Sequence, residues 1–516
     1  MLAMRTPTLL TSLAFALTGF GLTAQFQKLT LSGEAGSFPG KMALELSPGK
    51  TGVFGAVLLS PTPGPIPVRL IQSGDPRVLH VGATALMSMT AIFFPGGKAL
   101  APVVPVPNNP SFLDATIYLQ AITLNEIPGK IVTRISQPEP IRFAVAGRFR
   151  DRRTQFNAPR AFFPIVERGD QKMMMIGGGS GALLAQIATD KTEYYDPLTD
   201  SFKAGPNMRS ARSLHTATKL LDGRYLVVGG VDAKNDPQAS AEIYDPATDQ
   251  FTAVKSMAVK RMAHTASLLP DGRVLVAGGM LLVSSQDILG SIGSIQNNTE
   301  IYDPKTNSWS GGPNMRAPRA AHSAITLPDG RILLVGGISW FKILIVIPQI
   351  LKDCDIYDPK SNRIVAGPGM STPHTKAAVV SVGSGRWLLA GGGSAVTLTG
   401  GGGITMTDVA EIYDAGKNSW SSAGKLSMAR GAMEAFKIGS KVYCFGGGTG
   451  SLTKPIATNA TDAYDIASGK WSVAPAMSAS RLGFGAYVTK LGQIHFLGGG
   501  SGPAATVRNT TDWYYR

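Results

Sequence analysis

Short, largely apolar runs recur along the C-terminal two-thirds of the chain, each bounded by turn residues. His215–Leu220 and Tyr225–Val228 flank the pair Asp222-Gly223. Asp-Gly between two such runs predicts a β-hairpin in which both turn residues have positive φ. Ala241–Pro246, with its Tyr-Asp-Pro, predicts a third strand and a turn. Because the aromatic segment that follows favours a fourth strand, the pattern predicts small four-stranded antiparallel sheets.

This pattern repeats seven times at nearly constant spacing. Each copy has a diglycine, a basic residue 16 or 17 positions before it, and after it an acidic residue two positions before a Tyr. A large apolar residue lies seven positions after each of the first six tyrosines. The first glycines are Gly177, Gly229, Gly278, Gly336, Gly391, Gly446 and Gly498. One such sheet cannot bury both of its faces, whereas seven sheets packed in a ring can.

The fixed offsets between diglycine, Tyr-Asp and Trp resemble the kelch repeat over Arg160–Arg516. The resemblance implies an all-β fold with a seven-bladed kelch-type β-propeller, assigned to residues 147–516. The last copy ends after its third strand, which would leave a sheet edge unpaired. We expect Ala144–Arg153 to supply the missing fourth strand, with Arg150 at the position where other copies have Trp.

Two further segments precede the propeller. Met1–Ala24 contains Arg5, then the apolar Leu9–Leu22, and ends in a small residue. This is the pattern of a secretory signal peptide, with a short membrane anchor as the alternative. No other stretch is long and apolar enough to span a bilayer, so the expected location is secreted, periplasmic or cell-surface. Residues 25–146 lack the repeat, and their short strands between Gly and Pro turns predict an Ig-like or jelly-roll-like β-sandwich.

Composition narrows the partners. The chain has 516 residues, a formal net charge of +15 and two Cys. Two Cys exclude a disulfide scaffold and a Cys-rich metal protein, and we expect no cofactor. A basic chain attracts polyanions, and for an exported protein we expect a glycan or a membrane surface rather than nucleic acid.

The binding face is predicted from loop lengths. The interval from diglycine to Tyr varies between 15 and 24 residues, whereas the other intervals of the repeat are nearly invariant. Insertions therefore lie in the loops that join strands two and three, on the same face as the connections between blades. Insertions confined to one face indicate a binding face, with neutral variation of surface loops as the alternative.

One of these loops, 338–351, is unusually apolar. It contains Trp340, Phe341, Ile343 and Ile345, and it is too short to span a membrane. An exposed apolar patch of this kind indicates a contact surface. Three interpretations are open: packing on the N-terminal domain, binding of a partner protein, or contact with a membrane surface.

The repeated basic residues form the other candidate site. They are Arg160, Arg212, Arg261, Arg319, His374, Arg430 and Arg481. In kelch proteins that bind acidic peptides, Arg at this kind of position contacts the ligand, so the resemblance implies a ring that receives carboxylates at the channel mouth. The alternative is a structural salt bridge in every blade. Its acidic partners would be Glu193, Glu242, Glu300, Asp355, Glu411, Asp462 and Asp512.

Three histidines recur three positions after the basic residue. His215, His264 and His322 come from consecutive blades, whose backbones are expected about 10 Å apart. Ligands to one zinc ion must approach to about 2.1 Å, so packing is favoured over a metal site, and we predict no metal.

Two enzymes provide precedents on the same fold. The copper site of galactose oxidase needs two His, two Tyr and a Cys linked to one Tyr, whereas Cys354 and Cys444 fit small or apolar slots of the repeat. The bacterial sialic acid epimerase, a mutarotase, would use Arg and Glu at the channel mouth. The sequence favours a secreted, non-enzymatic protein whose loops recognise a glycan or protein ligand, acidic ligands included. A mutarotase-like enzyme is the alternative.

Overall fold

The computed structural model describes the chain in two parts. Between residues 30 and 142 it describes the backbone of strands only. From residue 149 to residue 514 it describes the chain with gaps at 169–171, 183–184, 197–200, 285, 398–402, 451–454, 489–493 and 502–505. Side chains are described from Gln155 onward, except at these gaps and in the strand residues of 182–186 and 501–506. The predicted signal peptide, 1–24, lies outside the described residues.

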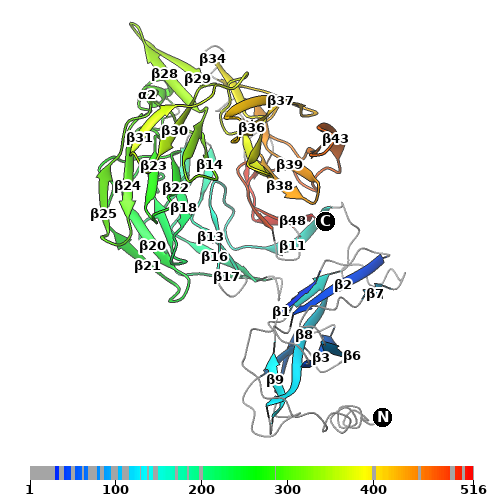
Figure 1. The fold of residues 1–516 in the computed structure, drawn as a ribbon. Coiled ribbons are helices and arrows are strands. Elements are labelled where there is room, and N and C mark those ends of the chain that lie inside the picture. Colours follow the sequence, from blue (N-terminus) through cyan, green and yellow to red (C-terminus); the bar gives the residue numbers. More distant parts are fainter. Residues whose placement is uncertain are drawn as a thin grey trace.

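Seven four-stranded antiparallel sheets form a ring around a central channel (Figure 1). Blade one contains β12 (Ile165–Glu167), β13 (Met173–Ile176), β16 (Thr192–Asp196) and β17 (Ser201–Ala204). Blade two contains β18 (Thr216–Lys219), β19 (Tyr225–Val228), β20 (Ala241–Asp245) and β21 (Gln250–Val254). Blade three contains β22 (Thr265–Leu268), β23 (Val274–Ala277), β24 (Thr299–Asp303) and β25 (Ser308–Gly311). Blade four contains β26 (Ser323–Thr326), β27 (Ile332–Val335), β30 (Cys354–Asp358) and β31 (Arg363–Ala366). Blade five contains β32 (Ala378–Gly383), β33 (Arg386–Ala390), β36 (Val409–Asp414) and β37 (Ser419–Lys425). Blade six contains β38 (Glu434–Ile438), β39 (Lys441–Phe445), β42 (Thr461–Asp465) and β43 (Lys470–Ala474). Blade seven contains β44 (Gly485–Val488), β45 (Ile494–Leu497), β48 (Thr510–Tyr514) and β11 (Phe149–Gln155). The predicted seven-bladed propeller is confirmed.

Blade seven is closed by a strand from the start of the propeller, as predicted. β11 pairs antiparallel with β48, and Phe149 lies opposite Tyr514. In blade two, Phe251 lies opposite Tyr244 in the same way, so Phe149 and not Arg150 occupies the slot of the repeated aromatic residue. The register shifts between Arg152 and Gln155, and this bulge adds residues that a count back from Arg160 does not include.

The hairpin turns differ in one detail from the prediction. Gly223 has a φ of 88°, whereas Asp222 is not in the positive-φ region. The amide of Gly223 donates to the carbonyl of Leu220 at 3.1 Å, and Leu220 pairs with Arg224. This is a three-residue loop that ends in a left-handed glycine, so one residue rather than two needs positive φ.

The diglycines allow neighbouring blades to approach closely. Gly229 has a φ of 66°, and a Cβ built there would lie 2.7 Å from the carbonyl oxygen of Arg261 in the next blade. The amide of Gly230 donates to that same carbonyl at 2.9 Å. No side chain fits between these two backbones, which explains why both positions are glycine.

Apolar side chains fill the space between adjacent sheets. Between blades two and three, Leu226 and Val228 of β19 share one cluster with Val274 and Val276 of β23 and with Tyr302. The tyrosine packs against the large residue seven positions later, with ring centroids of Tyr302 and Trp309 5.0 Å apart. This explains the constant interval of the repeat.

The insertions between strands two and three all belong to one face. They form the hairpins β14–β15 (Gly179–Ala182, Ala185–Ala188), β28–β29 (Ile338–Lys342, Val346–Ile350), β34–β35 (Gly393–Thr397, Gly403–Met406), β40–β41 (Gly448–Gly450, Pro455–Ala457) and β46–β47 (Gly500–Ser501, Thr506–Val507), and the helix α2 (Ile288–Gly293). Neighbouring insertions contact one another, for example β29 with β34 and β35 with β40. The hairpins therefore form a collar above one end of the channel, as the loop lengths predicted.

The N-terminal strands pair into separate sheets. One contains β1 (Thr30–Gly33), β2 (Gly40–Ser47) and β7 (Val103–Val106); another contains β3 (Val53–Ser60), β6 (Met87–Phe94), β8 (Thr116–Ile127), β9 (Lys130–Ile135) and β10 (Glu139–Arg142); β4 (Pro63–Pro67) pairs with β5 (Val78–Val81). These strands lie within residues 25–146, and the β-sandwich predicted there stays a prediction. In the described residues, no helix combines the length and apolar character required to cross a membrane.

Candidate functional site

A ring of seven residues encircles the channel axis below the collar. Each lies two positions after a repeated basic residue and has a left-handed backbone, with φ between 49° and 61°. The seven are Phe162, Leu214, Ala263, Ala321, Lys376, Ala432 and Gly483. Their backbones are linked from blade to blade: the amide of Leu214 donates to Phe162 at 3.2 Å, and that of Lys376 to Ala321 at 3.1 Å. Left-handed non-glycine residues are costly, and their concentration here marks a constrained site.

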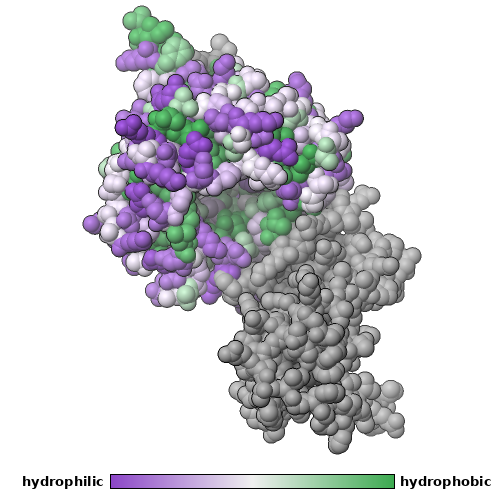
Figure 2. Space-filling model, viewed as in Figure 1, coloured by the Kyte–Doolittle hydropathy of each residue, from purple (hydrophilic) through white to green (hydrophobic). Residues whose placement is uncertain are grey.

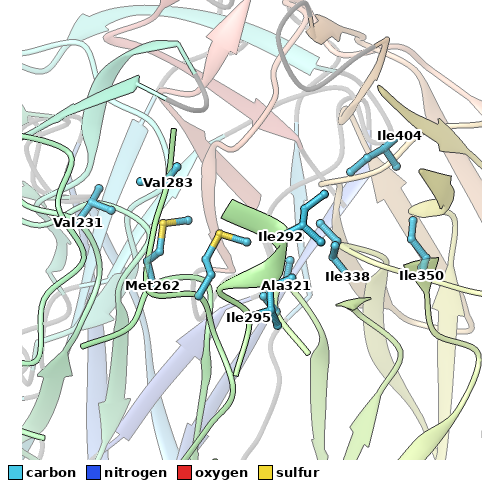
Figure 3. Packing of buried hydrophobic residues seen from close by; sticks show 11 residues of the cluster. Val231, Met262, Val283, Ile292, Ile295, Ala321, Ile338, Ile350 and Ile404 are labelled. Carbon is cyan, nitrogen blue, oxygen red and sulfur yellow. The ribbon is translucent and has the colours of Figure 1, made fainter. Parts of the chain in front are cut away.

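A cavity of about 1220 Å³, open mouth included, lies between this ring and the collar. Ring residues such as Leu214 and Ala321 form its floor, and insertion residues such as Val283, Ile292 and Ile404 form its walls. Figure 3 shows labelled members of this apolar cluster gathered along the inner ends of successive blades, from Val231 and Met262 to Ile404. The two sets of loops assigned to one face by sequence thus surround one site.

The cavity lining is almost entirely apolar. Of the described residues that line it, Lys376 is the one that ionises. Four hydroxyl groups also belong to the lining, and the Oγ1 of Thr375 and the Oγ of Ser291 already donate to backbone carbonyls. A large apolar pocket with one charged group is typical of a site for a mainly apolar ligand.

Lys376 is electrostatically coupled to Glu434, the first residue of the innermost strand of blade six. Burial lowers the pKa of Lys376, and the Glu434 carboxylate acts in the opposite direction. Burial raises the pKa of Glu434 to about 7, and Lys376 opposes this shift. Lys376 forms no ion pair or side-chain hydrogen bond with any residue of the described chain, so its charge is available to a ligand.

The repeated basic residues are buried and do not line the cavity. Each donates to the carbonyl of the first glycine of its diglycine and pairs with the acidic residue of the same blade. The guanidinium of Arg261 lies 2.6 Å from the Gly278 oxygen and 2.7 Å from the Glu300 carboxylate. The equivalent pairs are Arg160–Glu193, Arg212–Glu242, Arg319–Asp355, His374–Glu411, Arg430–Asp462 and Arg481–Asp512, at 2.6 to 3.2 Å.

This geometry favours the structural interpretation over the carboxylate-binding ring. Glu300 also accepts hydrogen bonds from the amides of Ala258 and Val259, at the end of the preceding blade. Each pair therefore connects the diglycine, the third strand and the blade before it. We do not assign ligand binding to the seven basic residues, because a guanidinium that is buried and paired in this way does not reach a ligand.

The three histidines pack between blades. His264 Nε2 lies 3.1 Å from the Thr216 hydroxyl, and His322 Nε2 lies 2.9 Å from that of Thr265. His215 lacks such a hydroxyl because blade one has Pro164 at the equivalent position. Burial lowers the pKa of His264 to about 3. Within the described chain, no three His, Cys, Asp or Glu side chains cluster as metal ligands would.

Sequence reasoning located the basic residue of each repeat but not the ring residue two positions later. The ring residues share no chemistry, since they include an aromatic, aliphatic side chains, a lysine and a glycine. The signal in the sequence was that the position two residues after the repeated basic residue varies, whereas the rest of the repeat is regular. Lys376 is the one charge at that offset, and a comparison of the aligned repeats could have found it.

The apolar loop 338–351 forms the hairpin β28–β29. Its ends are buried at Ile338 and Ile350, whereas Phe341, Ile343 and Ile345 are exposed and Trp340 is half-buried. The indole of Trp340 donates to the carbonyl of Ile295 at 3.1 Å. The structure thus separates the four predicted contact residues into a docked base and a free tip.

Sequence comparison now identifies the repeat. The kelch motif matches residues 221–258, 261–316 and 429–478. The ring of seven blades is a kelch β-propeller. The chain that contains this kelch propeller is 25% identical over 181 residues to a galactose oxidase of Gibberella zeae, a match that covers 33% of the chain and 25% of the relative. It is 30% identical over 157 residues to beta-scruin of Limulus polyphemus, covering 30% of the chain and 17% of the relative.

A solved structure extends the likeness in fold. A fungal alcohol oxidase of the AA5 family, in complex with copper, matches with a TM-score of 0.54 and 15% identity, covering 72% of this chain and 76% of that one. The kelch propeller shares the fold of that enzyme. The cavity itself does not offer the ligands that copper takes: its lining has no His, Tyr or Cys, and Cys354 and Cys444 are free thiols buried within sheets.

Proposed function

We propose that this kelch propeller is a binding protein whose loop-face cavity holds an apolar ligand that carries an acidic group. The observation that supports the proposal is the position of one lysine on the floor of a large apolar cavity. Apolar walls favour a ligand that loses water on entry. Lys376 then selects ligands with a negative charge, because its ammonium group makes no hydrogen bond or close ion pair within the described chain.

The cavity favours this ligand class over the glycan expected from sequence. A glycan presents hydroxyl groups on most of its surface, and each buried hydroxyl needs a hydrogen-bond partner. A protein ligand remains compatible where it inserts an apolar side chain beside an acidic group. A mutarotase-like reaction gains no support, because the Arg and Glu residues assigned to it are the buried structural pairs.

We also propose that the chain is exported through the segment 1–24, with residues 25–146 folded as a β-sandwich and the propeller starting near residue 147. The signal-like pattern of Met1–Ala24 supports export. The three- and five-stranded sheets of the N-terminal strands support a sandwich, since two such sheets can bury their apolar faces against each other.

Two fluorescent probes of similar size test the ligand class. 1-Anilinonaphthalene-8-sulfonate is apolar and anionic, and N-phenyl-1-naphthylamine is its neutral counterpart. We expect the protein to bind both, and Lys376→Met to weaken binding of the sulfonate by roughly tenfold or more, the usual worth of a hydrogen bond to a charged group. Binding of the neutral probe should change little. Fluorescence titration gives both dissociation constants.

Two further variants complete the test. Lys470→Met removes an exposed lysine of β43 and should leave both affinities unchanged. Ala432→Phe places on the ring an aromatic side chain that Phe162 already carries in the same backbone conformation, and it should weaken both probes by filling the cavity. If Lys376→Met and Lys470→Met changed the affinity for the sulfonate equally, the proposal would be contradicted. If Ala432→Phe bound both probes as tightly as the unaltered protein, the probes would bind outside the cavity.

Binding of the anionic probe should depend on pH through Glu434. The groups that interact with Lys376 are Glu434, His264 and His322. Burial keeps the pKa of His264 near 3 and that of His322 well below its usual value, so both stay neutral from pH 6 to pH 8. The pKa of Glu434 is about 7, and its ionisation above this value offsets the lysine charge. We expect sulfonate affinity to be about three- to tenfold higher at pH 6 than at pH 8.

The variant Glu434→Gln separates this effect from other pH dependences. It should bind the sulfonate at pH 8 as tightly as the unaltered protein does at pH 6, and its affinity should be nearly constant across that range. The neutral probe serves as the internal control. A pH dependence that persists in Glu434→Gln would show that another group is responsible.

A further inference from the structure

The hairpin β28–β29 carries the most exposed cluster of large apolar side chains in the described chain. Phe341, Ile343, Leu344 and Ile345 are 42%, 72%, 90% and 67% exposed. Figure 2 shows an apolar tip that protrudes from the propeller at the position of this hairpin in Figure 1. We call these four residues the apolar tip.

The base of the hairpin is firmly held. Ile338 and Ile350 belong to the cavity cluster, and Trp340 and Val346 pack against it. Val346 also lies against α2, where a Cβ built on Gly293 would be 3.2 Å from its Cγ2. The strands pair in register from Ile338 with Ile350 to Lys342 with Val346. The apolar tip is therefore presented outward by a rigid stem and is not a loose end of a loop.

Shape and size argue against a protein partner for the apolar tip. Its four side chains form a narrow, convex projection, whereas a stable protein interface buries roughly 800 Å² on each partner. A lipid bilayer needs no complementary pocket, because its acyl region accepts apolar side chains of any shape. Transfer of four large apolar side chains from water into this region is favourable, because it removes their apolar surface from water.

Charge specifies the kind of bilayer. The exposed Lys342 lies within the tip, whereas Lys352 and Asp353, both exposed, follow Leu351 at the base of the hairpin. The segment from Ile338 to Lys352 contains no acidic residue, and the whole chain has a net charge of +15. Lysines beside inserted apolar residues lie at headgroup level, where anionic phospholipids attract them.

We propose that the apolar tip inserts into the interface of an anionic phospholipid bilayer and docks the propeller there by its loop face. Ile338 lines the cavity and also begins the hairpin, so docking brings the mouth of the cavity toward the membrane. The inference rests on the hairpin alone and does not depend on which ligand the cavity binds.

Vesicle binding tests the proposal with the full chain. We expect the protein to sediment with vesicles of phosphatidylcholine and phosphatidylglycerol at 3:1 and to partition several-fold less onto phosphatidylcholine alone. Replacing Ile343, Leu344 and Ile345 together with Ser should lower partitioning onto the mixed vesicles by at least about tenfold. The matched control replaces Val365 and Val473, exposed on outer strands, with Ser and should bind as the unaltered protein does.

Two single variants examine charge and insertion. Lys342→Glu should weaken binding to anionic vesicles and leave binding to phosphatidylcholine alone unchanged. Leu344→Cys provides one accessible thiol, because Cys354 and Cys444 are buried. A polarity-sensitive dye on that thiol should increase in fluorescence when anionic vesicles are added, whereas the same dye on Val473→Cys should not.

Several results would overturn the proposal. One is equal partitioning by the tip variant and the control. A second is a protein that dimerises in sedimentation velocity, becomes monomeric in the tip variant and never binds vesicles, which would assign the tip to a second copy of the chain. A third is a large drop in thermal stability of the tip variant without any change in vesicle binding, which would show that the tip packs within the molecule. Probe binding in the cavity is measured separately, so either proposal can fail alone.

Discussion

Arg261→Ala should lower the free energy of unfolding by about 3 to 5 kcal/mol, because it leaves the buried Glu300 carboxylate without its countercharge. It also removes the guanidinium N–H that donates to the carbonyl of Gly278, the first glycine of the diglycine. The pair lies away from solvent, so the loss should change little between low and high salt. Urea unfolding followed by circular dichroism measures it.

A surface pair of the same blade is the control for Arg261. Arg273 lies 2.7 Å from Asp271 in the hairpin turn, and both side chains are partly exposed. Arg273→Ala should cost no more than about 1 kcal/mol, and that cost should shrink as salt is added. The double variant Arg261→Met with Glu300→Gln should be more stable than Arg261→Ala, because no buried charge remains unpaired. Equal losses for Arg261→Ala and Arg273→Ala would refute a structural role for the buried pair.

Gly278→Ala should be at least as disruptive as the loss of a buried pair. A Cβ at this position would lie 2.2 Å from the carbonyl oxygen of Arg319, a backbone atom of the next blade. The residue also has a φ of 64°, which alanine adopts at a cost. We expect a loss of about 3 kcal/mol or more, with a reduced yield of soluble protein.

Two other glycines separate the contributions to this loss. Gly223 has a φ of 88° but no atom near its Cβ position, so Gly223→Ala should cost about 1 to 2 kcal/mol from backbone strain alone. Gly311 is exposed with neither constraint, and Gly311→Ala should remain within about 0.5 kcal/mol of the unaltered protein. If Gly278→Ala resembled Gly223→Ala, the close approach between blades would not contribute to stability.

The repeat predicted the number of blades because each landmark has one structural task. The diglycine permits contact between blades, and the tyrosine lies opposite the apolar residue seven positions later. The position of Arg261 in the repeat could not decide its role. An arginine at this position can form a buried ion pair or contact a ligand. That choice depends on which way the guanidinium points.

The candidate site was less visible in the sequence. Lys376 is a candidate site residue because it belongs to a ring of backbone positions that come from all seven blades. No local sequence pattern predicts that these positions lie together. The bulge between Arg152 and Gln155 similarly shifted the expected slot from Phe149 to Arg150. Such features arise from contacts between distant parts of the chain, which intervals along the sequence do not contain.

The pairing of β11 with β48 has a consequence for how the molecule is made. The first strand of the ring leaves the ribosome long before its partner, Thr510–Tyr514, is synthesised. The circle therefore stays open until β48 has been translated, and closing it requires a slow pairing of two strands that are far apart in the sequence. Loss of β48 would leave six complete blades and would leave β11 without its partner strand.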